Sequence, residues 1–215
     1  MSLKVNEIFY SIQGESSFIG LPCVLVRLTG CNLRCSYCDT RYAYDEGNFR
    51  EIPDILDSVS SFRPHLVEIT GGEPLLQEET PFLIRQLLDK GYEVLLETNG
   101  TRPISTVDRR CVRIVDIKCP SSGESHNNDY GILDDLTDRD EVKFVIGERA
   151  DYDFARDILA SEKPARRISR PPIFSPAVPR LDPKTLAGWI LDDRLYVRLQ
   201  IQLHKTLWGS DARGV

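Results

Sequence analysis

The sequence of 215 residues has no apolar run that approaches the roughly 18 residues of a membrane-spanning helix, so we expect no association with a membrane. Its first residues lack the basic start and apolar core of a signal peptide. It also lacks a surplus of basic residues, since the net charge is −6, which makes a nucleic-acid partner unexpected. Internal repeats and low-complexity tracts are missing as well. The sequence therefore predicts a globular protein of the cytoplasm.

Cysteine is too sparse for a disulfide-rich scaffold, because six in a chain of this length give no dense framework. Cys23, Cys111 and Cys119 are most simply buried thiols in a reducing compartment. The other three lie close together at positions 31, 35 and 38, directly after an apolar segment. Thiolates are soft ligands that suit an iron–sulfur cluster or zinc.

The number of clustered cysteines separates these two kinds of site only in part. A four-iron cluster held by three cysteines leaves one iron free to bind a small molecule, whereas a structural zinc site needs four protein ligands. A zinc site would take its fourth ligand from the remaining cysteines and histidines, which are Cys23, Cys111, Cys119, His65, His126 and His204. The spacing alone leaves both alternatives open.

Short apolar runs alternate with amphipathic segments along the chain, which predicts β/α units and a parallel sheet. We expect strands at 24–29, 66–70, 93–97, 111–117, 142–146, 172–175 and 195–201. We expect helices at 52–62, 81–90, 151–160 and 183–191. A closed eight-unit barrel typically needs about 250 residues. The prediction is therefore an α/β fold with an incomplete, open β/α barrel of about six parallel strands in a single domain, 1–215, in which 164–183 forms an irregular surface crossing without an assigned function.

One charged residue falls inside the first expected strand. Arg27 faces the side opposite its apolar neighbours Val26 and Leu28. A buried guanidinium is costly unless it is paired. A ligand carboxylate would pair with it through two hydrogen bonds, and an internal salt bridge to Glu15 or Glu97 would serve equally well.

Two further motifs follow expected strands. Asp39 and Thr40 offer hard oxygen ligands that suit magnesium, although Asp39 can equally cap the loop. Segment 70–74, Thr-Gly-Gly-Glu-Pro, exposes backbone groups that a ligand can approach closely. Taken alone, segment 70–74 is an ordinary turn, as is the polar segment 11–15.

The cysteine motif and the glycine-rich turn together resemble the radical S-adenosylmethionine (SAM) superfamily. The whole chain is similar to the 7-carboxy-7-deazaguanine synthase family, through segments 10–15, 31–40, 70–74 and 199–205 and through Arg27. The resemblance implies a truncated barrel, a homodimer, a [4Fe-4S] cluster, SAM and Mg²⁺. It also implies a lyase that converts 6-carboxy-5,6,7,8-tetrahydropterin to 7-carboxy-7-deazaguanine and ammonia, on the route to queuosine. An electron donor such as flavodoxin or ferredoxin would be a partner.

The resemblance also implies roles for individual residues. Cys31, Cys35 and Cys38 would hold the cluster, and Thr40 would bind magnesium and, with Arg27, be catalytic. The residues that would contact SAM are Tyr37, Cys38, Asp39, Gly72, Asp116, Ile117, Lys118, Ser175, Pro176, Ala177 and Val178. The residues that would contact the pterin are Ile12, Gln13, Gly14, Arg27, Thr70 and the terminal Val215.

Two other functions compete with this interpretation. A radical SAM activase that makes a glycyl radical on a partner protein would not need Arg27 in the barrel or Thr40 on magnesium. A zinc-stabilised binding module would have no catalytic activity and would contain neither iron nor sulfide.

Overall fold

The computed structural model describes residues 1–161, 169–209 and 212–215, so the beginning of the irregular crossing expected at 164–183 lies outside the described residues. One sheet of nine strands forms the frame, in the order β3-β1-β2-β4-β5-β6-β7-β8-β9. The strands are β1 (Ser2–Ile12), β2 (Pro22–Leu28), β3 (Asn48–Glu51), β4 (Leu66–Gly71), β5 (Glu93–Thr98), β6 (Val112–Ile117), β7 (Glu141–Ile146), β8 (Ile173–Pro176) and β9 (Arg198–Leu199).

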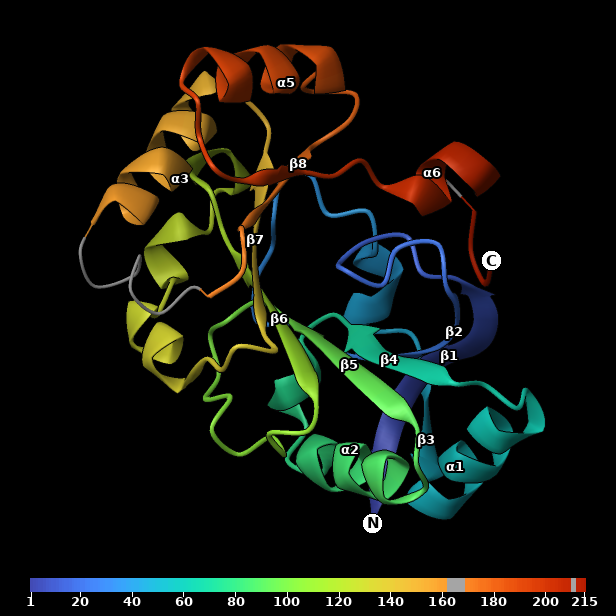
Figure 1. Ribbon diagram of the computed structural model, residues 1–215. Coiled ribbons are helices and arrows are strands. Elements are labelled where there is room, and N and C mark those ends of the chain that lie inside the picture. Colours follow the sequence, from blue (N-terminus) through green and yellow to red (C-terminus); the bar gives the residue numbers. More distant parts are fainter. Residues whose placement is uncertain (162–168, 210–211) are drawn as a thin grey trace.

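The strands from β2 through β4 to β9 pair in parallel, and the sheet is open because β3 and β9 form its two edges. The helices are α1 (Ile52–Ser61), α2 (Thr80–Asp89), α3 (Arg149–Ala160), α5 (Pro183–Asp192) and α6 (Leu203–Trp208). Figure 1 shows α1, α2, α3 and α5 around the outside of the curved sheet, with α6 near the carboxyl terminus of the chain. The prediction of an incomplete β/α barrel is confirmed.

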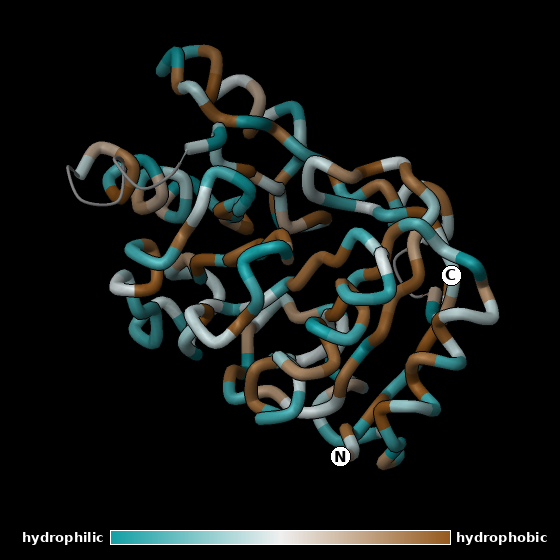
Figure 2. Tube along the Cα trace, turned by 60° about the horizontal axis from the view of Figure 1, so that its bottom comes forward, coloured by the Kyte–Doolittle hydropathy of each residue, from teal (hydrophilic) through white to brown (hydrophobic). Residues whose placement is uncertain are grey.

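Each helix packs an apolar stripe against the outer face of the sheet. In α1 the buried residues Ile52, Ile55, Leu56 and Val59 recur at helical spacing. They join α2 and the outward residues of β2, β4 and β5 in one apolar cluster, while α3 and α5 pack in a second cluster over β7 and β8. Figure 2 shows the hydrophobic segments following the strands and the hydrophilic segments in the surrounding loops. Among the described helices the longest, α3, has 12 residues, fewer than the ~20 that span a bilayer.

A third, smaller cluster lies on the inner face of the sheet. Cys23, Leu66, Leu95, Val112 and Ile114 form it. It fills the barrel near the amino ends of the parallel strands, and we call it the apolar floor. The polar residues nearer the carboxyl ends of the same strands lie directly above it.

Four elements differ from the sequence prediction. The antiparallel strands β1 and β3 were not expected, because β1 mixes charged and apolar residues and is stabilised by pairing with β2 on one side and β3 on the other. The strand expected at 195–201 is reduced to β9, since Val197 N–H turns back to the Leu195 carbonyl and Gln200 bonds to a distant loop. The short helix α6 was not expected either.

Candidate functional site

The loop that carries three cysteines follows β2 and packs closely against the turn after β4. A Cβ atom on Gly72 would lie 2.1 Å from the carbonyl oxygen of Gly30, so this position has no room for a side chain. Glu73 is fully buried and accepts hydrogen bonds from Leu75 N–H at 2.9 Å and Asn99 N–H at 2.7 Å. Glu73 N–H also donates to the Gly30 carbonyl at 2.7 Å, so the cysteine loop and the glycine-rich turn form one structural unit.

Cys31, Cys35 and Cys38 are half-buried free thiols on that loop. Burial raises the pKa of Cys35 to about 11, although the positive charge of Lys118 opposes the shift. In the part of the chain that the structure describes, no three side chains of the His, Cys, Asp and Glu types already form a ready-made metal site. The three thiols supply the soft donor set that an iron–sulfur cluster requires.

The cysteines considered as a fourth zinc ligand lie elsewhere. Cys23, Cys111 and Cys119 are fully buried in three different apolar clusters. Burial raises the pKa of each of these thiols, which disfavours the thiolate that binds a metal. Of the histidines, His65 and His126 are exposed, and His204 is half-buried on α6.

The carboxyl ends of β6 and β8 contain two buried polar atoms that have no hydrogen-bond partner among the described residues. These atoms are Oδ1 of Asp116 and Oγ of Ser175. Oδ2 of Asp116 pairs with Nζ of Lys118 at 2.8 Å. Buried polar groups are normally paired, so the two free atoms fit a polar ligand bound at this end of the barrel, where SAM contacts were expected.

The other residues expected to contact SAM differ in whether their side chains face the site. The Tyr37 hydroxyl reaches the carbonyl of Val145 at 3.3 Å, which holds its ring against β7. Ile117 is 1% exposed and packs in the outer apolar cluster, so its side chain faces away from the site. Ala177 is buried beside buried Pro176, whereas Val178 is 51% exposed. Of these five positions, Tyr37 has the side chain best placed for the site.

Arg27 has an internal partner that the sequence did not reveal. Its Nε donates to Oε1 of Glu7 on β1 at 2.7 Å, and the Tyr42 hydroxyl donates to the same oxygen at 3.0 Å. The internal partner is therefore Glu7, and the expected salt bridge to Glu15 or Glu97 was wrong. Among the described residues the outer nitrogens of this guanidinium have no hydrogen-bond partner, which leaves them open to a carboxylate.

Glu15 and Glu97 pair instead with Lys143 on β7. The Lys143 ammonium bonds to both carboxylates, at 2.5 Å for Glu97, and its side chain is 4% exposed. Burial lowers the pKa of Lys143, but the two carboxylates more than offset this and hold it charged. Sequence reasoning missed Lys143 because no motif marks it.

Residues 12–14 lie at the opposite end of the barrel from the cysteine loop. Ile12 pairs with Pro22 at the start of β2, so the loop that follows β1 closes the barrel near the amino ends of the parallel strands. The Gln13 amide donates to the carboxyl of Glu68 on β4, and Glu15 N–H donates to Gln13 Oε1 at 3.1 Å. This loop thereby points polar groups into the barrel beneath Thr70.

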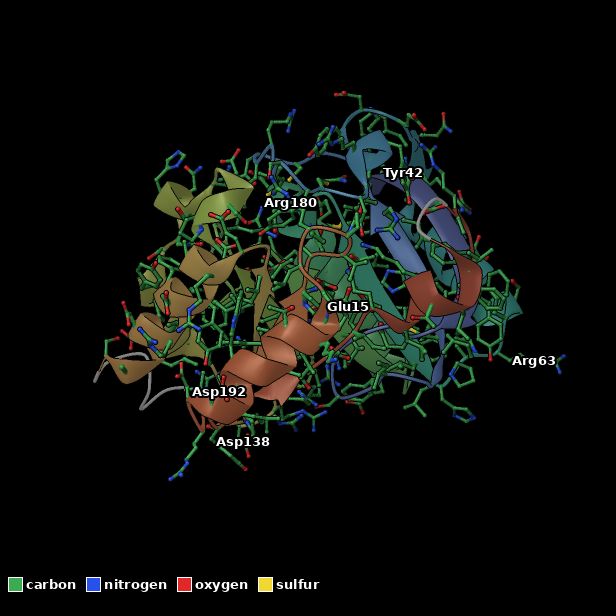
Figure 3. All side chains as sticks on the ribbon, turned by 90° about the horizontal axis from the view of Figure 1, so that it is seen from above. Glu15, Tyr42, Arg63, Asp138, Arg180 and Asp192 are labelled. Carbon is green, nitrogen blue, oxygen red and sulfur yellow. The ribbon has the colours of Figure 1, made fainter. Side chains whose placement is uncertain are left out.

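The carboxyl-terminal segment holds this loop from the open side of the sheet. Leu203 N–H donates to the Gly14 carbonyl at 3.0 Å, and Gln202 donates to Glu15 at 2.6 Å. A Cβ atom on Gly14 would lie 2.1 Å from Nδ1 of His204, so glycine is required for this close approach. In Figure 3, Glu15 lies near the centre of the molecule, with Tyr42 and Arg180 above it in that view.

Asp39 and Thr40 place two oxygen atoms side by side at the top of the site. Thr40 Oγ1 donates to Asp39 Oδ1 at 2.8 Å, and Lys205 Nζ lies 2.7 Å from Asp39 Oδ2. Burial raises the pKa of Asp39, but Lys205 and the Thr40 hydrogen bond hold it well below its usual range. A charged carboxylate beside a hydroxyl is a suitable donor pair for magnesium.

The terminal Val215 lies near Ile12 at the end of β1. Both residues line a cavity of about 380 Å³ together with Tyr10, Ser11, Pro22, Trp208 and Gly214. Two residues earlier, the Arg213 guanidinium stacks on the Tyr42 ring at 3.7 Å. The end of the chain therefore folds back along β1 and over the ring that contacts Glu7.

Comparison with known proteins connects this site to one group of enzymes. Residues 25–116 match the family model for the radical SAM superfamily. The chain is 46% identical to 7-carboxy-7-deazaguanine synthase from Koribacter versatilis over 99% of its length and 100% of the relative. It is 47% identical to the enzyme of the same name from Chlorobaculum tepidum, covering 99% and 97% of the two chains. The crystal structure of QueE from Escherichia coli is similar in fold, with a TM-score of 0.76, 22% identity and 95% of each chain covered.

Proposed function

The chain belongs to the 7-carboxy-7-deazaguanine synthase family of radical SAM enzymes, and we propose that its barrel binds SAM at one end and a carboxylated tetrahydropterin at the other. The reaction is the ring contraction of 6-carboxy-5,6,7,8-tetrahydropterin to 7-carboxy-7-deazaguanine with release of ammonia. A [4Fe-4S] cluster held by Cys31, Cys35 and Cys38 would supply the electron for reductive cleavage of bound SAM, which would provide the hydrogen-abstraction chemistry that the ring contraction needs.

The observation that supports this proposal most strongly is the separation of two kinds of polar group inside one barrel. Soft thiol donors and the free polar atoms of Asp116 and Ser175 lie toward the carboxyl ends of the strands. Arg27 and Lys143 lie on the inner face below those groups, and Lys143 pairs with Glu15 on the loop after β1. A small planar substrate between the two ends would meet SAM on one side and the polar lining on the other.

The roles of the chain's own residues follow from these positions. Cys31, Cys35 and Cys38 hold the cluster, which leaves one iron for SAM. The SAM site is completed by Tyr37, Cys38, Asp39, Gly72, Asp116, Ile117, Lys118, Ser175, Pro176, Ala177 and Val178. Of these, Gly72 and Ile117 can contribute through their backbone only, because Gly72 has no room for a side chain and Ile117 faces outward.

Arg27 is proposed to bind the substrate carboxylate with its outer nitrogens, while Glu7 holds its Nε in place. Ile12, Gln13, Gly14 and Thr70 line the pterin, and the position of Val215 beside Ile12 suits a contact through the same loop. Thr40 offers its hydroxyl to Mg²⁺, which would bring the oxygens of the substrate and the protein together.

The partners form a separate part of the proposal. We expect a homodimer in the cytoplasm and an electron donor of the flavodoxin or ferredoxin type. Exposed apolar side chains gather near the open side of the sheet, on the loop after β1 and on the segment from β9 to α6 that bonds to it: Ile19, Leu21, Leu199, Ile201, Leu207 and Trp208. Equilibrium sedimentation of the wild type and of Ile201→Asp tests whether this surface joins two copies.

The direct test is anaerobic reconstitution with iron and sulfide, followed by incubation with SAM, Mg²⁺, a strong reductant and the carboxytetrahydropterin. We expect 7-carboxy-7-deazaguanine and ammonia in equal amounts, and neither from Cys35→Ala. Cleavage of SAM without conversion of the pterin, in the wild type, would instead favour another radical SAM reaction such as glycyl-radical activation. A protein that holds zinc and no iron would contradict the whole assignment.

A further inference from the structure

Glu68 is a buried carboxyl to which no role has yet been given. It lies on β4 between Leu66 and Thr70 on the inner face of the sheet, and it is 3% exposed. Leu66 belongs to the apolar floor, and Thr70 lies above it at the strand end. Glu68 therefore sits at the bottom of the proposed pterin pocket, where it is shielded from bulk water.

Charged groups reach Glu68 from several elements. The titratable groups that interact with it are Glu15 on the loop after β1, Glu97 on β5, Lys143 on β7, and Arg27 and Cys23 on β2. Beyond these, His204 faces Glu15 and Asp116 faces Lys143. The carboxyl groups of Glu15, Glu68 and Glu97 thus lie around the single ammonium of Lys143.

The geometry decides which of the three carboxyls lacks a cation. Lys143 bonds to Glu15 and Glu97, so its charge is shared between those two. Among the described residues Glu68 accepts its hydrogen bond from the neutral amide of Gln13, and no cation bonds to it. A third negative charge here would be buried without compensation, which is costly. Glu68 is therefore the carboxyl that keeps its proton.

Glu68 and the Glu15 backbone N–H together fix the orientation of the Gln13 side chain. Gln13 Oε1 accepts from Glu15 N–H at 3.1 Å, so Nε2 must point toward the Glu68 carboxyl. The Gln13 backbone in turn bonds to Leu21 and Gly20 across the loop, each at 2.8 Å. A line of hydrogen bonds therefore runs from β4 into the loop proposed to contact the pterin.

We propose that Glu68 is a positioning residue that acts as a neutral carboxylic acid: it anchors Gln13 and leaves the charge of Arg27 to the substrate carboxylate. The inference rests on the proposed function, because it requires an anionic substrate. Burial, followed by repulsion from Glu97, raises the pKa of Glu68 to about 8. Above that pH the ionised Glu68 would compete with the substrate for Arg27, because a negative charge on Glu68 acts on the Arg27 guanidinium.

The test measures the dissociation constant of the carboxytetrahydropterin on the reconstituted, SAM-bound enzyme from about pH 6 to pH 9.5, a range that brackets the ionisation. For the wild type we expect constant affinity below the pKa and a loss of up to about tenfold per pH unit above it. Glu68→Gln keeps the acceptor for Gln13 and cannot ionise, so its affinity should match the wild type at pH 7 and stay level. Ionisation of the ligand itself affects both proteins equally, so it cancels in the ratio of their dissociation constants.

Two controls separate anchoring from charge. Glu68→Val removes the acceptor for Gln13 and should lose roughly 3- to 10-fold in affinity at every pH, the size of one hydrogen bond. The affinity of the wild type for a tetrahydropterin without the carboxylate should depend much less on pH, because this ligand has no carboxylate to pair with Arg27. An equal slope for both ligands would overturn the role assigned to Arg27's charge.

A measurement without pterin separates this inference from the proposed function. In the infrared spectrum of the holoenzyme, the carbonyl band of a protonated carboxyl should disappear as the pH rises through about 8, and Glu68→Gln should lack that band. If the band titrates as expected but neither protein binds the carboxypterin, the proposed function fails while the protonation of Glu68 stands. If the band is missing at pH 7, or if wild type and Glu68→Gln share one pH course in pterin affinity, the inference is overturned.

Discussion

The two ends of the barrel are built in opposite ways. At the cysteine loop, three half-buried free thiols offer sulfur donors for a cofactor. At the other end, Gln13, Glu15 and Lys143 are buried and already paired with one another or with their neighbours. The first end is completed by a cofactor, whereas the second is organised before any ligand arrives.

The same difference explains which end can be predicted from the sequence. The cysteine loop joins residues a few positions apart, so a motif shows it. The polar lining joins residues 128 positions apart in the Lys143–Glu15 pair and 187 apart in the Gln202–Glu15 pair. In the proposed function, the cluster site depends on local spacing, whereas the substrate site depends on tertiary structure. The predictions below test that contrast.

The largest effect is expected at the cofactor end. Cys35→Ala removes one of the three proposed cluster ligands, so iron content and SAM cleavage should fall to background while the fold and the polar lining stay intact. Cys23→Ala is the matched control, because that thiol is fully buried in the inner apolar cluster. Iron and sulfide analysis with an ultraviolet–visible spectrum checks both. Normal iron and activity in Cys35→Ala would show that the loop does not hold the cluster.

The reverse outcome is expected at the substrate end. Lys143→Met leaves two carboxylates buried without their cation and should cost about 3–5 kcal/mol of unfolding free energy, with the cluster ligands untouched. Arg139→Met breaks an exposed ion pair with Glu93 and serves as the control, for which we expect little change. Urea denaturation measures both. Equal, small losses would mean that the lining is not preorganised.

A substitution of Arg27 tests whether the substrate end recognises a carboxylate. Arg27→Lys should weaken binding of the carboxypterin by roughly 10- to 150-fold, the size of a charge-assisted hydrogen bond, since lysine lacks the planar fork. Affinity for SAM and for a pterin without the carboxylate should change little. If both pterins lose affinity equally, or if the protein mainly loses thermal stability through the broken Glu7 pair, Arg27 has a structural role.

Glu68 should make the free energy of unfolding depend on pH. The pKa of this carboxyl rises from an ordinary value of 4.5 to about 8 on folding, so the folded protein holds the proton more tightly than the unfolded chain. Its contribution is complete below the unfolded pKa and is lost as the pH rises through the folded pKa. Relative to Glu68→Gln, the wild type should lose up to about 1.4 kcal/mol per pH unit in that window. Parallel curves from denaturation of the two proteins would refute the shift.

The smallest effect concerns the boundary between the two ends. Thr40→Val removes one oxygen beside Asp39 and should raise the Mg²⁺ concentration for half-maximal turnover roughly 3- to 10-fold. SAM binding should remain, because the cysteines are unchanged. Turnover followed against Mg²⁺ in wild type and variant gives the answer, and identical titrations would remove Thr40 from the magnesium site.

The sequence predicted the parallel strands and the outer helices because their apolar periodicity is strong, as in α1 and β4. It missed β1, whose charged residues Lys4 and Glu7 interrupt the pattern, and with it the true partner of Arg27. It missed Glu68 and Lys143 for another reason: a charged residue in a buried strand signals a partner without saying which. Those partners depend on strand register and on the carboxyl-terminal segment, which no local pattern encodes.

The central claim is that both ends of the barrel act on one pterin, and an isotope experiment tests it most directly. The carboxytetrahydropterin labelled with deuterium at C6 is incubated with the reconstituted enzyme, SAM, Mg²⁺ and reductant, and the label is followed by mass spectrometry. The account predicts that deuterium leaves C6 and appears in recovered SAM, that one SAM serves many turnovers, and that Arg27→Lys slows the transfer while Cys35→Ala abolishes it. Product formed with all deuterium retained at its original carbon, or 5′-deoxyadenosine formed without loss of the label, would contradict the claim.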